Sequence, residues 1–114
     1  MSSLKDRVDR GIRLLDEQLP DWDKGVNLAT LNLGNGRFCV LGQLFGRYED
    51  GHHRIGLQSE TQAVLHGFHI MCKSSRLPEP LEMERWEELT NVWRLQIANR
   101  RRTKTQQIEL LMAA

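Results

Sequence analysis

The chain has 114 residues, 39% of them hydrophobic, and its 16 basic and 15 acidic side chains leave a formal net charge of +1. This length suits one modest hydrophobic core, so a single domain is expected. A charge near zero gives no overall field that would draw the molecule to nucleic acid or to an acidic membrane. The longest apolar runs fall far below the roughly 20 residues that cross a bilayer, which argues against a membrane span.

The first residues and the two cysteines indicate in which cellular compartment the protein is expected to lie. The opening Met-Ser-Ser-Leu-Lys-Asp lacks the apolar run of a signal peptide, and Cys39 and Cys72 do not form a CxxC pair. We therefore expect a cytoplasmic protein with free thiols.

The first segment predicts an α-helix, because its apolar residues recur every three or four positions and so share one face. Those residues are Leu4, Val8, Ile12, Leu15 and Leu19. Ser2 or Ser3 can cap the helix, and Pro20 ends it because the residue before a proline avoids the α region. Trp22 is then expected to fold back onto the core.

The middle of the chain predicts one irregular turn followed by a helix. Residues 26–33 mix the spacings of a strand and of a helical turn, and we favour the turn. Gly34-Asn35-Gly36 breaks the chain, and the apolar spacing from Val40 to Tyr48 predicts a helix that ends at Asp50-Gly51. Gly42 and Gly46 each cost up to about 1 kcal/mol of helix propensity, so a neighbouring segment is expected to pass close to them.

Two further helices are predicted. Ser59-Glu60-Thr61-Gln62 is a capping box that opens a short helix ending at Gly67. After a loop at residues 73–80, the longest helix follows, with one apolar stripe and Met83 at its edge. The stripe consists of Trp86, Leu89, Trp93 and Ile97.

The apolar stripe of the last helix meets Arg100 and Lys104 beyond Ile97. Basic side chains are not expected to face a hydrophobic core. The packed domain is therefore predicted to end near Ala98, where the helix face changes from apolar to basic. We divide the chain into a helical domain at residues 1–99 and an extension at residues 100–114, basic first and then apolar. The predicted fold is all-α, a compact bundle of about four helices with a long C-terminal helix.

Metal and thiol chemistry each have candidate residues. Four histidines accompany the cysteines, and His69-Ile-Met-Cys72 has a zinc-ligand spacing, but no second ligand pair completes a motif. Cys39 near a helix start suggests a thiolate, yet its apolar neighbours favour a buried, inert thiol. The histidines are His52, His53, His66 and His69. With no phosphate loop or catalytic triad pattern, we expect no metal, no cofactor and no enzyme.

The basic cluster near the C-terminus has three interpretations that the sequence leaves open. It comprises Arg94, Arg100, Arg101, Arg102 and Lys104. These residues can be a solvated helix end that complements the macrodipole, a contact to an acidic protein surface, or a phosphate-binding patch. A helix-turn-helix is a weaker alternative, with residues 59–66 as the first helix and residues 70–77 as the recognition helix.

Several segments together resemble a family of small uncharacterised proteins of actinobacteria, especially mycobacteria, and of their phages. The resemblance covers about residues 14–101, and Cys-Val-Leu-Gly-Gln-Leu from Cys39 is its most specific part. The other segments are Leu15-Asp-Glu-Gln-Leu-Pro-Asp-Trp22, Leu28 to Leu33, the block continuing as Phe45-Gly-Arg-Tyr48 with Asp50-Gly51, Gly67-Phe68, and Trp86-Glu-Glu-Leu-Thr90 with Trp93. His52-His53 depart from the family pattern, in which an apolar residue follows the glycine.

The resemblance implies a cellular context and no reaction: a small accessory protein that binds a host or phage protein. We therefore predict a non-enzymatic module that binds a protein partner, associates with itself, or does both. The predicted contact residues are Arg100, Arg101, Arg102, Lys104, Ile108 and Leu111. The alternative is a DNA-binding regulator that uses the cluster from Arg100 to Lys104.

Overall fold

The computed structural model describes residues 3–70 and 78–113, and all regular structure in these ranges is helical. The elements are α1 (Leu4–Gln18), the 3-10 turn η1 (Trp22–Gly25), α2 (Val40–Phe45), α3 (Tyr48–Arg54), α4 (Glu60–Leu65) and α5 (Glu79–Ala113). The all-α prediction with a long C-terminal helix is thus confirmed. The described part has five α-helices rather than about four, because the helix predicted after Gly36 is divided in two.

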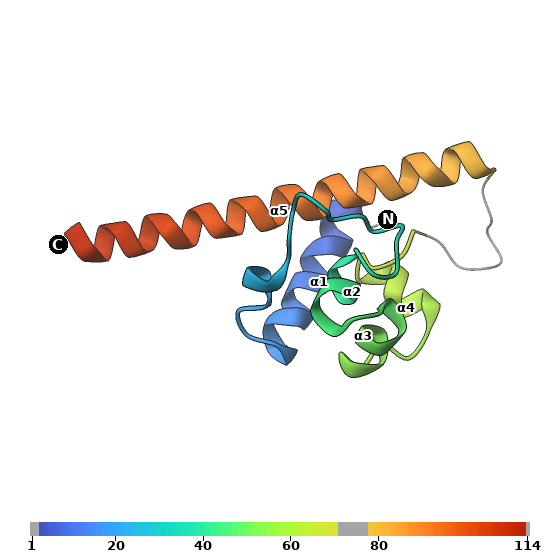
Figure 1. The fold of residues 1–114 in the computed structure, drawn as a ribbon, viewed down its shortest axis with the longest axis horizontal. Coiled ribbons are helices and arrows are strands. Elements are labelled where there is room, and N and C mark those ends of the chain that lie inside the picture. Colours follow the sequence, from blue (N-terminus) through green and yellow to red (C-terminus); the bar gives the residue numbers. More distant parts are fainter. Residues whose placement is uncertain (1–2, 71–77, 114) are drawn as a thin grey trace.

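Helix α5 runs along one side of the molecule, and α1 and the three short helices pack beneath its first half (Figure 1). Its C-terminal part projects beyond the other elements, which gives the molecule principal extents of 55 × 28 × 27 Å. Within the described residues, none of the helices combines the length and the apolar character needed to span a bilayer.

The hydrophobic core forms around Trp93 of α5, which is fully buried. Its ring meets Trp22 edge-on at 6.1 Å between centroids and packs against Phe68 at 5.3 Å. The indole nitrogen donates a 2.6 Å hydrogen bond to the carbonyl of Gly67, so this large side chain leaves no buried donor unpaired. The predicted stripe is confirmed, since Leu89 and Ile97 of the same face are also fully buried.

Helix α1 begins at a capping box. The Ser3 hydroxyl accepts from the backbone N–H of Asp6, and the Asp6 carboxylate accepts from the N–H of Ser3. Val8 and Leu15 bring the apolar face of α1 into the core, as predicted. Pro20 follows the helix end, and Trp22 is buried, so the predicted return of the chain to the core is confirmed.

The prediction of one helix from Val40 to Gly51 is wrong, because the chain breaks at Gly46. Gly46 has φ +95°, a conformation that L side chains rarely adopt, and it separates α2 from α3. Gly42 does meet the predicted close neighbour: a Cβ there would lie 2.2 Å from the carbonyl oxygen of Gly36. Gly51 lies within α3 rather than ending it, and a Cβ there would lie 2.7 Å from that of Leu41.

Residues 26–33 form the predicted irregular segment, and side chains of α5 bond to part of its backbone. Thr90 accepts a 3.0 Å hydrogen bond from the N–H of Leu33, and Arg94 donates to the carbonyls of Leu28 and Leu31. Arg94 therefore has a structural role in the domain. Most of the predicted loop at residues 73–80, and of the alternative recognition helix at residues 70–77, lies outside the described residues.

Tyr48, the single tyrosine of the chain, is partly buried against the core, and its ionisation provides a spectroscopic test of this position. Burial raises its pKa to about 12 from an ordinary value of 10.0. We expect absorbance titration at 295 nm to give a midpoint near 12 in the native chain and near 10 in concentrated urea. Because the folded pKa is the higher one, this tyrosine's contribution to stability is complete below pH 10 and declines between pH 10 and 12. A native midpoint near 10, with the helical circular dichroism intact, would contradict the burial of this side chain.

Candidate functional site

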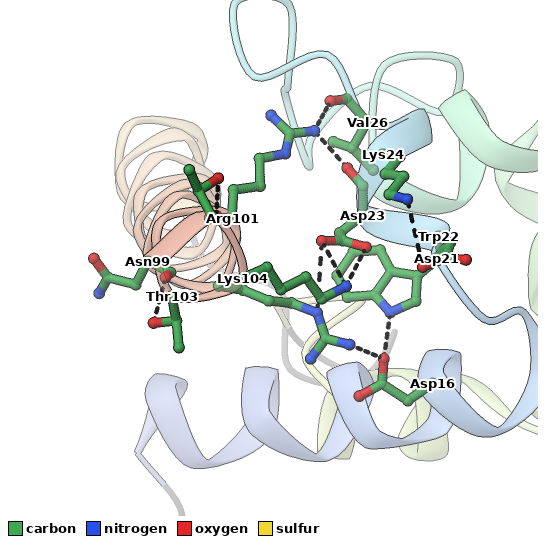
Figure 2. A network of polar contacts seen from close by, with 12 residues as sticks. Asp16, Asp21, Trp22, Asp23, Lys24, Val26, Asn99, Arg101, Thr103 and Lys104 are labelled. Carbon is green, nitrogen blue, oxygen red and sulfur yellow. Dashed lines mark hydrogen bonds and ion pairs between the residues drawn. The ribbon is translucent and has the colours of Figure 1, made fainter. Parts of the chain in front are cut away.

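The basic residues at the end of the packed part of α5 face a buried acidic turn (Figure 2). Asp21 adopts the left-handed conformation with φ 64°, which aspartate tolerates better than most residues. This bend after Pro20 turns η1 so that both Trp22 and Asp23 point inward, each with only 1% of its surface exposed. A buried carboxylate requires cationic or hydrogen-bonding partners, and α5 provides them.

Two basic side chains of α5 contact the carboxylate of Asp23. The Lys104 ammonium lies 3.1 and 3.2 Å from the two carboxylate oxygens, and the Arg100 Nε lies 3.7 Å from one of them. Arg100 also donates to Asp16 of α1, whose Oδ1 accepts a 2.9 Å hydrogen bond from the Trp22 indole. The Arg100 guanidinium lies 5.7 Å from the centre of the Trp22 ring, within the range of a cation–π contact.

Arg101 contacts the backbone of the same turn. Its guanidinium donates to the carbonyls of Asp23 and Val26, where η1 ends. We call this set the ion-pair cluster. It consists of Asp16, Trp22, Asp23, Arg100, Arg101 and Lys104. It joins α5 to both α1 and η1, because its acidic members come from these two elements and its basic members from α5.

The six predicted contact residues divide into two groups. Arg100, Arg101 and Lys104 belong to the ion-pair cluster, whereas Arg102 is exposed. Ile108 and Leu111 are 57% and 79% exposed. Contacts between α5 and the domain thus continue to Lys104, beyond the boundary expected near Ala98.

The packed part of α5 extends past Ala98 because the surface beneath the helix becomes acidic at the point where the helix face becomes basic. Where the stripe turns cationic, the opposing surface offers Asp16 and Asp23 instead of apolar side chains. Both acids occur in the segment Asp16-Glu-Gln-Leu-Pro-Asp-Trp-Asp23. Sequence reasoning missed them because neither has a motif, although a surplus of acids next to a tryptophan predicted to be buried was the available signal.

From Arg101 to Leu111, α5 forms one wall of an open groove with a volume of about 740 Å³, and η1 with Val26 forms the other. We call it the α5 groove. Val26 contributes an apolar wall on the η1 side, and Ile108 and Leu111 contribute one on the helix side. Asp21 and Lys24 stand at the rim with exposed side chains. The structure thus brings the two predicted apolar contact residues together at one concave site.

The candidate nucleophile Cys39 has a structural position. Its side chain is 2% exposed and its sulfur accepts a 3.2 Å hydrogen bond from the N–H of Gly42, so the cysteine caps α2. Burial raises the pKa of the Cys39 thiol, which favours the unreactive protonated form. The Nε2 of His69 lies 3.5 Å from a carboxylate oxygen of Glu60, and its ring meets that of Trp86 edge-on with 4.9 Å between centroids. Among the described residues, which exclude Cys72, no three histidine, cysteine or acidic side chains converge as metal ligands would.

No family model, curated protein or solved structure matches this chain. The resemblance to actinobacterial and phage proteins therefore stays a prediction. The assignment of function rests on the geometry of the C-terminal half of α5, where an anchored segment passes directly into an exposed one.

Proposed function

We propose that this protein is a small non-enzymatic accessory module that binds another protein through the end of α5. The observation that carries the proposal is the segment at residues 105–113, which we call the α5 extension. It is helical and exposed along its whole length, with no part of the domain covering it (Figure 1). Its apolar side chains at Ile108, Leu110, Leu111 and Met112 are 57–82% exposed. Such a concentration of exposed apolar surface is typical of an interaction site.

The ion-pair cluster explains how the α5 extension can be helical without packing. A short helix is marginal in water because its first turn is costly to nucleate. Here the extension continues a helix that is already fixed by Ile97 in the core and by Lys104 on Asp23. Among the predicted contact residues, Arg100, Arg101 and Lys104 therefore anchor the helix, whereas the exposed Ile108 and Leu111 can contact a partner.

The proposed setting is the cytoplasm of an actinobacterium or of its phage-infected cell, and this rests on the sequence resemblance alone. DNA binding receives less support than protein binding. Arg100, Arg101 and Lys104 already have carboxylate or carbonyl partners inside the molecule, which leaves Arg102 as the exposed member of the predicted phosphate-binding set. One exposed arginine supplies little counterion release.

Truncation after Lys104 tests the proposed function, because it removes the α5 extension and keeps the ion-pair cluster. We expect the truncated chain to keep its thermal midpoint within a few degrees. In an affinity capture from actinobacterial lysate, proteins retained by the full chain should be lost, and each should then bind the purified full chain directly. The matched control is Arg102→Ala, which should retain them.

Two outcomes would contradict the proposal. One is capture of the same proteins, in the same amounts, by the truncated chain. The other is salt-dependent retardation of duplex DNA by the full chain that is lost in Arg102→Ala, which would favour the DNA-binding alternative.

A further inference from the structure

We propose that a small cavity beside the first turns of α5 binds an organic cation of the alkylammonium class, such as a choline-type headgroup or a methylated lysine side chain. We call it the aromatic cavity. This binding goes beyond the proposed function and does not depend on it, because Trp86 precedes the α5 extension by about 28 Å of helix at about 1.5 Å of rise per residue. The side chains that line the cavity are those of Cys39, Tyr48, Glu49, Phe68, His69 and Trp86.

Aromatic side chains from three separate parts of the chain meet at this cavity. Tyr48 belongs to α3 and Trp86 to α5, whereas Phe68 and His69 follow α4. The centroid of the His69 ring lies 4.9 Å from that of Trp86 and 6.4 Å from that of Tyr48, with interplanar angles of 68° and 58°. Rings at such steep angles do not stack face to face, so they leave π surface at the cavity. Several rings around one space are typical of sites that recognise quaternary ammonium groups.

The cavity has room for one small group, because two glycines form part of its wall. Gly34 and Gly36 line it, and its volume is about 170 Å³. Sites for drug-sized ligands span about 300–1,000 Å³, so this one suits a headgroup or the end of a side chain. Tyr48, His69 and Trp86 are each half-buried, so the rings can be reached from solvent.

Charge favours a cation over a neutral ligand of the same shape. Glu49 has an exposed side chain at the cavity, and none of the described lining residues is a lysine or an arginine. Burial contributes most to the raised pKa of Tyr48, which is about 12. Its neighbours Cys39, Glu60 and Glu49 raise this pKa further, so the two glutamates place negative charge within reach of the cavity. A bound cation would therefore be attracted both by the rings and by carboxylates.

The test compares two ligands of the same shape by isothermal titration calorimetry of the full chain. One is choline, and the other is its neutral isostere, in which a tert-butyl group replaces the trimethylammonium group. We expect choline to bind about tenfold more tightly, because the isostere has the same apolar surface and no charge. Equal affinities would show that the cavity selects apolar shape alone and would overturn the inference.

A second titration distinguishes the two sources of the cation. It uses a short peptide with one trimethyllysine and the same peptide with unmodified lysine, which should bind more weakly. Tighter binding of the trimethyllysine peptide than of choline supports a protein side chain as the ligand. Tighter binding of choline supports a free headgroup.

Two pairs of variants locate the binding. Trp86→Leu should weaken choline binding about tenfold, whereas Trp86→Phe keeps a ring and should retain most of it. The control Phe38→Leu makes an equivalent change at a 46% exposed ring outside the cavity and should have no effect. Glu49→Gln should weaken choline about threefold without affecting the isostere, and its control is Asp50→Asn at the next residue. Circular dichroism confirms that each variant is folded.

Two further results would overturn the inference. One is the absence of binding by both choline and the trimethyllysine peptide at millimolar concentration. The other is choline binding that is unchanged in both Trp86→Leu and Glu49→Gln. Neither result bears on the proposed function, because truncation after Lys104 leaves the aromatic cavity intact and tests the α5 extension alone.

Discussion

Asp23→Asn is expected to destabilise the domain by about 2–3 kcal/mol. The substitution keeps the size of the side chain and removes the charge that Arg100 and Lys104 share. Removing one partner of a fully buried ion pair costs about 3–5 kcal/mol. We reduce this value because the two cations are 28% and 36% exposed and can recover part of their hydration. Urea unfolding followed by tryptophan fluorescence and circular dichroism measures the effect.

The matched control for this substitution is Asp21→Asn, two residues away. Its side chain is 67% exposed and its ion pair with Lys24 spans 3.9 Å, so the change should stay within about 0.5 kcal/mol. Lys104→Met should cost less than Asp23→Asn, because Arg100 then remains to neutralise the carboxylate. Equal effects of Asp23→Asn and Asp21→Asn would show that the ion-pair cluster contributes nothing to folding.

Gly42→Ala is expected to destabilise the domain by at least about 3 kcal/mol, although helix propensity alone favours alanine by about 1 kcal/mol. The added Cβ would lie 2.2 Å from the Gly36 carbonyl oxygen and 2.7 Å from the Arg37 carbonyl carbon. Both are backbone atoms, so neither can rotate away as the end of a side chain could. The steric term therefore exceeds the propensity term, and the unfolding midpoint in urea should fall.

Substitutions at two other glycines distinguish steric overlap from backbone strain as the cause of the destabilisation. Gly46→Ala has no atom within 4 Å of its new Cβ but must adopt φ +95°, so we expect a loss of about 1–3 kcal/mol from backbone strain alone. At Gly36 the nearest contact would be the Tyr48 Cβ at an ordinary 3.8 Å, so Gly36→Ala should be nearly neutral. If Gly42→Ala is as stable as the unmodified chain, the close approach of the Gly36 loop to α2 is wrong.

Periodicity and capping predicted most of the fold. The apolar spacing of α1 and of Leu89, Trp93 and Ile97 corresponds to the buried faces, because a single helix face against a core produces a local pattern. The break at Gly46 could not be derived in the same way. A glycine inside an apolar helical pattern has the same appearance whether it admits a neighbour, as Gly42 does, or ends the helix, as Gly46 does.

The candidate site was predicted in part. Ile108 and Leu111 were identified because they restore apolar character to the helical stripe beyond Lys104, and the structure places both at the α5 groove. The partners of Arg100 and Lys104 were not predicted, since Asp16 lies 84 positions from Arg100 and Asp23 lies 81 positions from Lys104 in the sequence. Pairing between distant charges depends on how helices cross, and one sequence without its relatives contains no local signal of that crossing.

The unbroken course of α5 from Glu79 to Ala113 has a thermodynamic consequence for any partner. Segments that fold only on binding spend about 2–5 kcal/mol of their interaction energy on ordering, and they show a large negative heat capacity change. The extension is already ordered as part of the same helix that crosses the core, so its association should be nearly free of this cost. Binding should then resemble the docking of two rigid surfaces, with a heat capacity change set by the apolar area that Ile108, Leu111 and their neighbours bury.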